Sequence, residues 1–363
     1  MPNNSIDLIY CWVDGNDPDI KKKKRKKLQE CQIDGRHKFH NKEFNNKTRD
    51  RDNQELKYSL RSVEKYMPWI NHIYIVTDGQ IPEWLKLNRH VSIVDHREII
   101  PSKYLPTFNS LVIESHLHLI PNLSERFIYS NDDLLLFQPV YPHYFFNGDL
   151  PIYRFQMKPT TTQCELLGNT DKYIFSDGMG ELEIPERSQK VINNWIDKCH
   201  DLRLYSWKGI PITEEVGHIS QWKNANSLLD KKFTCDKRFQ LFHCFRPFTI
   251  RQCLEAQHLF RDEIQLSNNY PFRSIRSIGT VNALYPYMSL YQNQALVATN
   301  SDDRFTVYMK DDIYLNYIQM VYMVNIRPMF ICLQDGYSDD KITASYLEYL
   351  GIFYPKKSCW ENK

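Results

Sequence analysis

The chain lacks any long, uninterrupted apolar stretch. Although 42% of its 363 residues are hydrophobic, no run approaches the roughly 18 residues that a helix needs to cross a bilayer. The first residues, Met1 to Asp7, also lack the basic region and apolar core of a secretory signal. The expected location is therefore the cytoplasm, either free or peripheral at the inner face of the membrane.

Closely paired cysteines are missing as well. The nine cysteines are an odd number and include no Cys-x-x-Cys motif, which fits free thiols in a reducing compartment better than a disulfide framework. Cys235, Cys244 and Cys253 recur every nine residues near His243. A zinc site there has weak support, because structural zinc sites use closer ligand pairs.

There is no strong excess of charge of either sign. The formal net charge is +2, so no global field attracts nucleic acid, and we expect no nucleic-acid partner. Basic residues do concentrate in one run, Lys21 to Lys27. Such a run is typical of a solvated or disordered segment, and contact with anionic lipid head groups is the alternative. We expect no regular structure from this run to about Thr48.

Strand and helix patterns alternate up to about residue 150. Three apolar runs indicate buried strands that end in an aspartate: Ile6–Asp14, His72–Asp78 and Val91–Asp95. Asp52 to Glu55 has the spacing of a capping box at the start of a helix. The alternation predicts a mainly parallel α/β sheet.

Two adjacent carboxylates stand between apolar runs. Asp132 and Asp133 follow a strand pattern from Phe127 to Ser130 and precede a second apolar run that ends at Phe137. Burying such a pair is costly unless a cation meets it, and hard divalent cations prefer carboxylate oxygens. Ligands of open α/β sheets bind beyond the carboxyl ends of strands. A plain turn is the other interpretation, and these residues alone leave both open.

The pattern changes in the second part of the chain. Helices are expected over Pro185–Cys199, Ile250–Ile264 and Asp339–Leu350, and a short strand over Met329–Leu333 delivers Asp335 to a strand end. We therefore divide the chain into an α/β half, 1–150, and a mostly helical half, 151–363, that packs on it.

Several stretches resemble one protein family. They are Asp7–Pro18, Arg51–Trp69, Ile73–Leu85, Leu105–Ser110 with Ile113–His116, and Tyr129–Asp133. Together they look like the Stealth family, which includes bacterial capsular and exopolysaccharide phosphotransferases and the animal lysosomal-enzyme N-acetylglucosamine-1-phosphotransferase. The resemblance is dense from about residue 6 to 140 and thins after that. It implies that the half 1–150 binds nucleotide sugar and metal and that the half 151–363 completes the active site.

This resemblance implies a fold and an activity. The fold would be a Rossmann-like sheet of the A-type glycosyltransferase kind, with the helical C-terminal half packed on it. The activity would be transfer of hexose-1-phosphate from a nucleotide-diphosphate sugar, expected to be UDP-linked, to a hydroxyl of a glycan or lipid-linked oligosaccharide. The product would be a phosphodiester of a capsular or extracellular polysaccharide. The cofactor would be Mg²⁺ or Mn²⁺. The protein would contact the capsule machinery or the inner membrane peripherally.

The resemblance also assigns residues to roles. The metal ligands would be Asp132, Asp133 and Asp335, with Asp133 and Asp14 also catalytic. His243 would be the general base or nucleophile, and Arg273 and Arg251 would grip phosphate oxygens. Asp7 and Arg61 would line the pocket. The chain departs from the family pattern at Tyr270, where a histidine is expected, and at Gln334, where an asparagine is expected.

Two other functions use the same features. An ordinary metal-dependent glycosyltransferase would move the sugar alone and release a nucleoside diphosphate. A non-catalytic subunit of a capsule-assembly machine would keep the motifs as structure.

Overall fold

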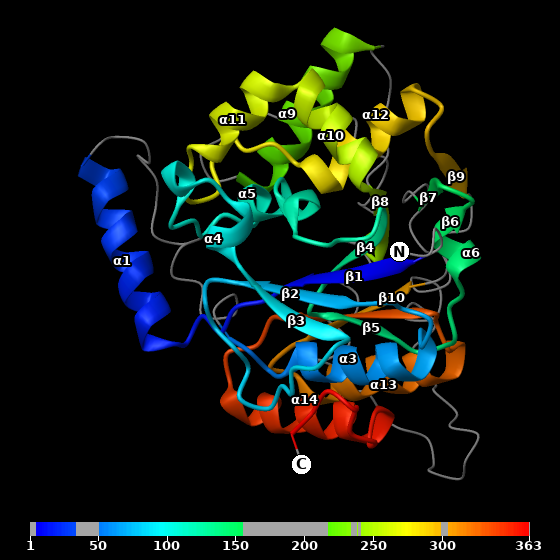
Figure 1. Ribbon diagram of the computed structural model, residues 1–363. Helices are drawn as coiled ribbons and strands as arrows, with labels where there is room; N and C mark the ends of the chain where they lie inside the picture. The colour runs from blue at the N-terminus through cyan, green and yellow to red at the C-terminus, as the bar shows by residue number, and fades with distance from the viewer. Residues whose placement is uncertain are drawn as a thin grey trace.

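A five-stranded sheet organises the molecule, for which a computed structural model describes residues 5–33, 51–154, 217–233, 238, 241–298 and 304–362. The strand order is β3-β2-β1-β4-β8 (Figure 1). The strands are β1 (Ile6–Cys11), β2 (Ile73–Thr77), β3 (Val91–Asp95), β4 (Arg126–Asn131) and β8 (Arg246–Thr249). The first four run parallel, and β8 pairs antiparallel with β4. The predicted, mainly parallel α/β sheet is confirmed.

A second sheet continues directly from the first. It has the order β10-β11-β5, where β10 is Arg304–Met309, β11 is Phe330–Asp335 and β5 is Leu134–Leu136. The chain leaves β4, passes through the two adjacent aspartates and enters β5, and the backbone carbonyl of Asp133 already accepts a 2.9 Å hydrogen bond from the Leu333 amide. The carboxylate pair therefore lies at the junction between the sheets.

Strands on both sides of residue 150 share these sheets. Beyond that residue the chain contributes β8, β10 and β11, and β9 (Leu296–Ala298) joins a small sheet with β6 (Phe146–Asn147) and β7 (Leu150–Arg154). The predicted halves 1–150 and 151–363 are thus interleaved, and the second is less purely helical than expected. The helix expected over Pro185–Cys199 lies outside the described residues.

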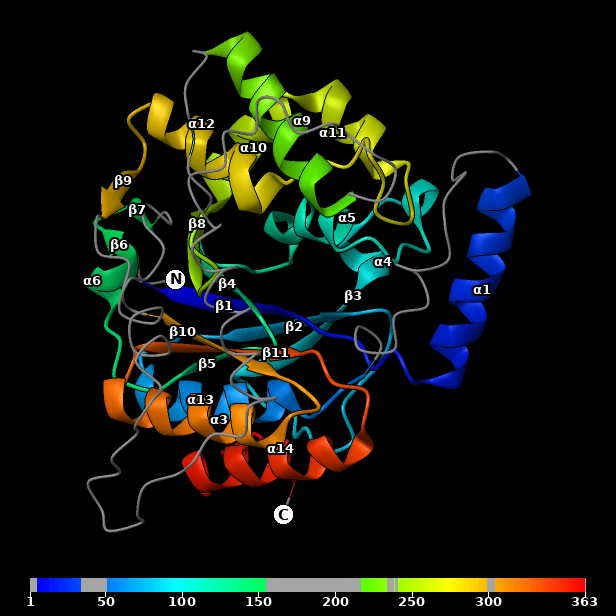
Figure 2. The same ribbon diagram turned by 180° about the vertical axis from the view of Figure 1, so that it is seen from behind.

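Helices cover both faces of the sheets (Figures 1 and 2). Above the first sheet in Figure 1 lie α4 (His96–Ile99), α5 (Ser110–Glu114), α9 (Gly217–Lys232), α10 (Ile250–Leu259), α11 (Arg261–Asn268) and α12 (Tyr285–Tyr291). Below lie α3 (Glu55–Tyr66), α13 (Ile313–Ile326) and α14 (Asp340–Phe353), and the single turn α6 (Pro142–Phe145) leads into β6. None of the helices within the described ranges is long and apolar enough to span a membrane.

The period of two in the strands creates a core on each face. Ile9 and Phe127 pack in the upper core, and their neighbours Leu8 and Ile128 pack in the lower one. Because both faces of β1 and β4 are covered, polar groups in this part of the sheet are accessible mainly where the strands end.

Two local predictions are wrong. The basic run forms helix α1 (Pro18–Ile33), which is ordered because Ile20 and Cys31 are buried on its inner face. The rest of the segment expected to lack regular structure, from residue 34 to Thr48, lies outside the described residues. The capping box expected from Asp52 to Glu55 does not form, since α3 begins at Glu55 after Gln54 in a left-handed conformation, φ 62°. Asp52 instead accepts a 2.8 Å bond from the Gln54 amide.

Candidate active site

A cavity of about 350 Å³ opens at the carboxyl ends of β1, β2 and β4. Its floor includes Cys11, Val76 and Asn131, the last residues or near-last residues of these strands. Charged side chains of both signs line it: Asp78, Glu114, Asp132, Lys24, Arg51 and Arg273. This is the position where open α/β sheets bind ligands.

Asp132 faces this cavity among like charges. Burial raises the pKa of its carboxyl well above the ordinary value, and repulsion from Asp133, Glu55 and Asp52 raises it further. Burial likewise raises the pKa of Glu55 to about 7, although Asn53 donates to its carboxylate from the backbone at 2.7 Å and from the side chain at 2.8 Å. The acids therefore hold more negative charge than their protein surroundings stabilise.

Asp133 meets His243 and Cys332 on the neighbouring side. The His243 Nε2 atom lies 3.9 Å from Asp133 Oδ1, and the Cys332 thiol donates to Oδ2 at 3.6 Å. Burial raises the pKa of Asp133 to about 6, against the lowering effects of the Cys332 hydrogen bond and of Arg304. Within the described part of the chain, Asp133 Oδ1 is buried and has no hydrogen-bond partner.

Two arginines that the sequence analysis missed support this site: Arg246 is buried and Arg304 is half-buried. Arg304 on β10 donates to the backbone carbonyl of His243 at 2.7 Å, and Arg246 on β8 lies over the Tyr129 ring, 5.4 Å from its centroid. Both lower the pKa of Asp133. Arg246 stands three residues after His243, so proximity to that histidine was an available signal; no local pattern pointed to Arg304.

Arg273 forms the opposite wall. Its Nη2 atom donates to Ser110 Oγ at 2.8 Å, and its charge, with that of Arg246, lowers the pKa of Glu114 against the larger effect of burial, which raises it. The Tyr129 hydroxyl donates to Glu114 at 3.3 Å. The structure therefore brings Arg273 to the same cavity as Asp132, although the two are 141 positions apart in the sequence.

Asp335 and Asp14 lie next to the cavity but do not line it. Asp335 ends β11 and binds Arg51 through both carboxylate oxygens, at 3.2 and 3.0 Å. Asp14 accepts the Asn16 amide at 2.8 Å and borders a second hollow, of about 820 Å³, together with Asp17 and Asp52.

Three predicted residues are placed elsewhere, and each has a structural explanation. Asp7 sits near the amino end of β1, fully buried, and accepts bonds from the Ser124 amide and the Asn71 side chain. Arg61 makes two 2.7 Å bonds to Glu361, which tie α3 to the end of the described chain. Arg251 is exposed on α10 and pairs with Glu255 at 2.9 Å. The structure does not bring these three to the cavity.

His116 and His118, which follow Glu114 of the cavity wall in the sequence, are buried packing residues. Burial lowers the pKa of both, that of His118 to about 4. His116 follows α5, and His118 lies in the 3₁₀ turn Leu117–Leu119.

The residues at the junction fit a divalent cation. Asp132 and Asp133 supply carboxylate oxygens, their charge is poorly compensated, and Asp133 Oδ1 lacks a partner among the described residues. Mg²⁺ binds through one or two carboxylates together with substrate phosphates. Within the described ranges, the compact group of possible ligands is Asp133, His243 and Cys332, whose ligand atoms lie within 4.8 Å of one another. Of the three predicted metal ligands, Asp132 and Asp335 are outside that group.

The cysteines also follow the expectation of free thiols. All those in the described ranges are unpaired by disulfides. The nine-residue spacing does not gather a zinc site there, since Cys244 donates to the Phe245 carbonyl at 3.2 Å and Cys253 packs in the upper core. Cys235 lies outside the described residues.

Comparison with known proteins gives related sequences over the same region. Residues 49–152 match the family model "Stealth protein CR2, conserved region 2". The capsular polysaccharide phosphotransferase LcbA of Neisseria meningitidis is 29% identical over 341 residues, 93% of this chain and 79% of that protein. Cps12A of Actinobacillus pleuropneumoniae, also a capsular polysaccharide phosphotransferase, is 42% identical over 62% of this chain and 57% of its own length.

A streptococcal relative and one solved structure complete the comparison. The receptor polysaccharide phosphotransferase WefC of Streptococcus gordonii is 44% identical over 52% of this chain and 54% of its own length. The chain thus spans little more than half of two of these relatives. A bifunctional glycosyltransferase, WbbM, aligns with 95% of this chain and 49% of its own at 10% identity, with a TM-score of 0.36, too low to assign a shared fold.

The family match and the site coincide. The matched segment contains α3, β2, β3, β4 and both aspartates of the sheet junction, and the relatives extend the similarity on either side of it. Over this segment the chain is similar to the Stealth family, and these relatives are named as polysaccharide phosphotransferases.

Proposed function

We propose that this chain transfers a sugar-1-phosphate unit from a nucleotide-diphosphate sugar to a glycan hydroxyl in the synthesis of a capsular or extracellular polysaccharide. The relatives named as polysaccharide phosphotransferases support this class of reaction. The observation that carries it is the poorly compensated carboxylate pair at the sheet junction, with His243 on one side and a cavity containing Arg273 on the other.

The reaction exchanges one phosphorus–oxygen bond for another. The acceptor hydroxyl oxygen attacks the phosphorus that carries the sugar, and the bridging bond of the diphosphate breaks. A phosphodiester forms and the nucleoside monophosphate leaves with the electron pair of the broken bond. Such transfers are catalysed mainly by positioning and by neutralising oxygen charge.

The cations of the cavity suit the diphosphate. Arg273, Lys24 and Arg51 line the same cavity, and arginine binds phosphate oxygens through a planar fork of donors. A Mg²⁺ or Mn²⁺ ion held by Asp132 and Asp133 would neutralise the diphosphate further. Asp335, bound to Arg51, would orient that arginine.

His243 is the proposed general base. Its Nε2 atom lies close to Asp133, and Arg304 holds its backbone carbonyl at 2.7 Å, so both the ring and its segment are positioned at the junction. A neutral imidazole can take the proton of the acceptor hydroxyl near neutral pH. We expect His243→Ala to lower kcat by about a hundredfold or more, while the protein stays folded.

The proposed compartment is the cytoplasm, with a UDP-linked sugar as donor. Thiols stay reduced in such a compartment, and the cysteines in the described ranges form no disulfide. Contact with the inner membrane or with capsule machinery would be peripheral.

The released nucleotide tests the proposal. The purified chain is incubated with Mg²⁺, glycan acceptors and a panel of nucleotide-diphosphate sugars, and the nucleotide product is identified by chromatography. Release of the monophosphate, lost in His243→Ala and kept in Arg251→Ala, supports sugar-phosphate transfer. Release of the nucleoside diphosphate would instead indicate an ordinary glycosyltransferase. If no nucleotide is released from any donor, the chain would be a non-catalytic assembly subunit.

A further inference from the structure

Helix α1 joins the active-site cavity through its inner side. Ile20 and Lys24, one helical turn apart, both line the cavity. Lys23 donates to Asp78 at 2.9 Å, and Asp78 lines the cavity as well. The helix stands beside the edge of the sheet at which β1 ends (Figures 1 and 2). One side of α1 is therefore part of the wall of the site.

The outer side of the same helix carries a row of cations. Lys22, Arg25 and Lys26 follow the i, i+3, i+4 spacing of one helical face, and all three are exposed. No acidic side chain in the described ranges pairs with them. Since like charges at this spacing destabilise a helix, the arrangement favours a counter-charge from beyond the described residues.

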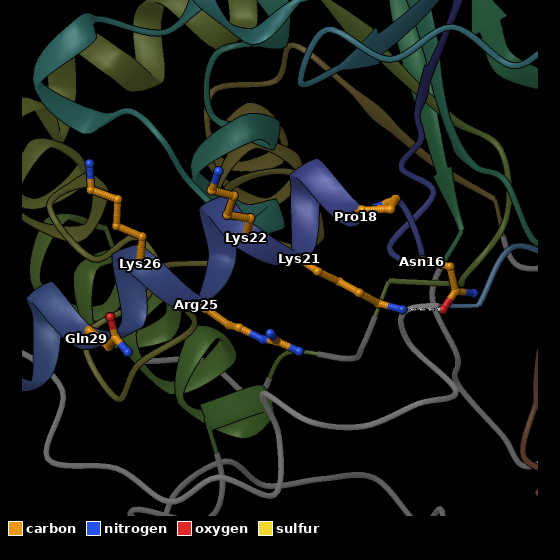
Figure 3. A pocket seen from close by; sticks show the side chains of 7 residues that line it. All are labelled: Asn16, Pro18, Lys21, Lys22, Arg25, Lys26 and Gln29. Atoms are coloured by element: carbon orange, nitrogen blue, oxygen red, sulfur yellow. Dashed lines mark hydrogen bonds between the residues drawn. The ribbon is translucent and has the colours of Figure 1, made fainter.

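These cations border a hollow. With Lys21 and Gln29 they line a space of about 490 Å³ along α1. Figure 3 shows Lys22 and Lys26 rising from one flank of the helix, and Lys21 and Arg25 extending from the other, where Lys21 donates to Asn16 at 3.0 Å. Lys22 to Lys26 spans about 6 Å at 1.5 Å per residue, which suits an extended chain that carries more than one negative charge.

We propose that this face of α1 binds an anionic acceptor, a polysaccharide chain that already contains phosphodiester groups. The inference rests on the proposed function, because each transfer leaves one negatively charged phosphodiester in the product. A chain lengthened by such transfers is a polyanion. Lys22, Arg25 and Lys26 contact the phosphodiesters of earlier repeats while the terminal hydroxyl enters the cavity that Lys24 lines.

A glycan fits these observations better than a membrane surface does. The phosphodiesters that such transfers add match these cations in charge and recur along the chain. The inner side of the same helix lines the reaction cavity through Lys24, whereas Lys22 and Lys26 lie on its opposite side. An acceptor whose end enters the cavity therefore passes around α1, next to these cations.

The test compares acceptors of graded length. The wild-type chain and a triple variant, Lys22→Ala/Arg25→Ala/Lys26→Ala, are assayed with phosphodiester-linked hexose oligosaccharides of one to several repeats. The triple variant should raise KM for the longest acceptor about tenfold and leave kcat and the KM of the single-repeat acceptor unchanged. The matched control is Lys231→Ala/Lys232→Ala/Arg261→Ala, which removes three exposed cations far along the chain and should change neither constant.

Direct binding separates this inference from the proposed function. Fluorescence anisotropy measures affinity for a labelled multi-repeat oligosaccharide and for its neutral counterpart without phosphate; the anionic one should bind more tightly, lose affinity in the triple variant and weaken with salt. If the enzyme is active and the triple variant has the same KM values as the wild type for every acceptor, the inference is overturned and the proposed function is unaffected. Binding to phosphatidylglycerol vesicles, lost in the triple variant, without binding to the oligosaccharide would overturn it in favour of a membrane contact.

If no nucleotide sugar is consumed at all, the proposed function fails, and the anisotropy result alone then decides. Tight binding of the anionic oligosaccharide through α1 would uphold the acceptor face, and equal binding by both variants would overturn it.

Discussion

Among the described residues, charges withdrawn from water are compensated differently at structural positions and at the sheet junction. Asp7 and Arg61 are buried with complete sets of partners: Asp7 accepts two hydrogen bonds of 2.7 and 2.8 Å, and Arg61 binds both oxygens of Glu361. Asp132 and Asp133, at the sheet junction, have strongly raised pKa values and a buried oxygen without a partner in the described structure. Burial alone does not mark a functional charge, but incomplete compensation does.

The difference follows from position along the strands. Asp7 lies near the amino end of β1, where the Ser124 amide and Asn71 surround it. The two junction aspartates lie beyond the carboxyl end of β4, where the backbone leaves one sheet for the other and a cavity replaces protein partners. A ligand can meet charge only where the protein leaves room for it.

The largest expected effect is on catalysis at the junction. Asp133→Asn should lower kcat by about a thousandfold, because the neutral amide can neither hold a divalent cation nor stabilise a protonated His243. Thermal unfolding should be little changed or shifted upward, since a buried charge is removed. Nucleotide release and a melting curve measure the two effects.

Asp7→Asn serves as the paired control for this experiment. It should lower the melting temperature and leave kcat of the folded protein near normal. A folded Asp133→Asn protein with near-normal activity would show that the active site is not at the sheet junction.

The next largest effect is on stability at the paired region. Arg61→Met leaves Glu361 buried without its partner, which should cost about 3 kcal/mol of unfolding free energy. Because Arg61 is not at the cavity, kcat at a temperature where the variant is folded should match the wild type. Urea unfolding and steady-state kinetics check these two expectations. A loss of kcat without a loss of stability would show that Arg61 acts in the donor pocket.

A smaller effect couples metal to pH. The pKa of Asp133 is raised to about 6 and that of Glu55 to about 7 in the folded chain, so ionising them destabilises the fold. The metal-free protein should therefore lose stability as pH rises from about 4 to 7. Mg²⁺ should restore it, by a few degrees in Tm at pH 8 and by less at pH 5. A Mg²⁺ shift that is independent of pH, or unchanged in Asp132→Asn, would contradict the proposed metal site.

The smallest effect is expected at Arg251. Its side chain is exposed and its partner is Glu255 on the same helix, so Arg251→Ala should leave KM for the donor and kcat within about twofold of wild type, as surface ion pairs contribute little. A titration of the nucleotide-sugar donor with the wild type and the variant measures both constants. A tenfold rise in the KM for the donor would show that Arg251, although exposed and paired with Glu255, contributes to donor binding.

Local sequence features predicted much of the site. Arg273 was predicted only from the family resemblance, whereas the strands that end at the cavity and the paired aspartates follow from hydrophobic pattern and residue type. They are properties of short segments, which periodicity reveals. The basic run was misread for the same reason: its charge is visible in the sequence, but the burial of Ile20 and Cys31 that makes it a helix is not.

By itself, the sequence determined the parallel sheet, the resemblance to the Stealth family and the acidic pair at the end of β4. Tertiary structure alone decided which distant residues meet that pair. The pairing of β8 with β4 sets Arg246 opposite Tyr129, that of β11 with β5 brings Cys332 to Asp133, and Arg304 secures the segment of His243. The tertiary structure also places Asp7, Arg61 and Arg251 away from the cavity. Partners so far apart along the chain are chosen by the packing of whole sheets and helices, and no short segment encodes that choice.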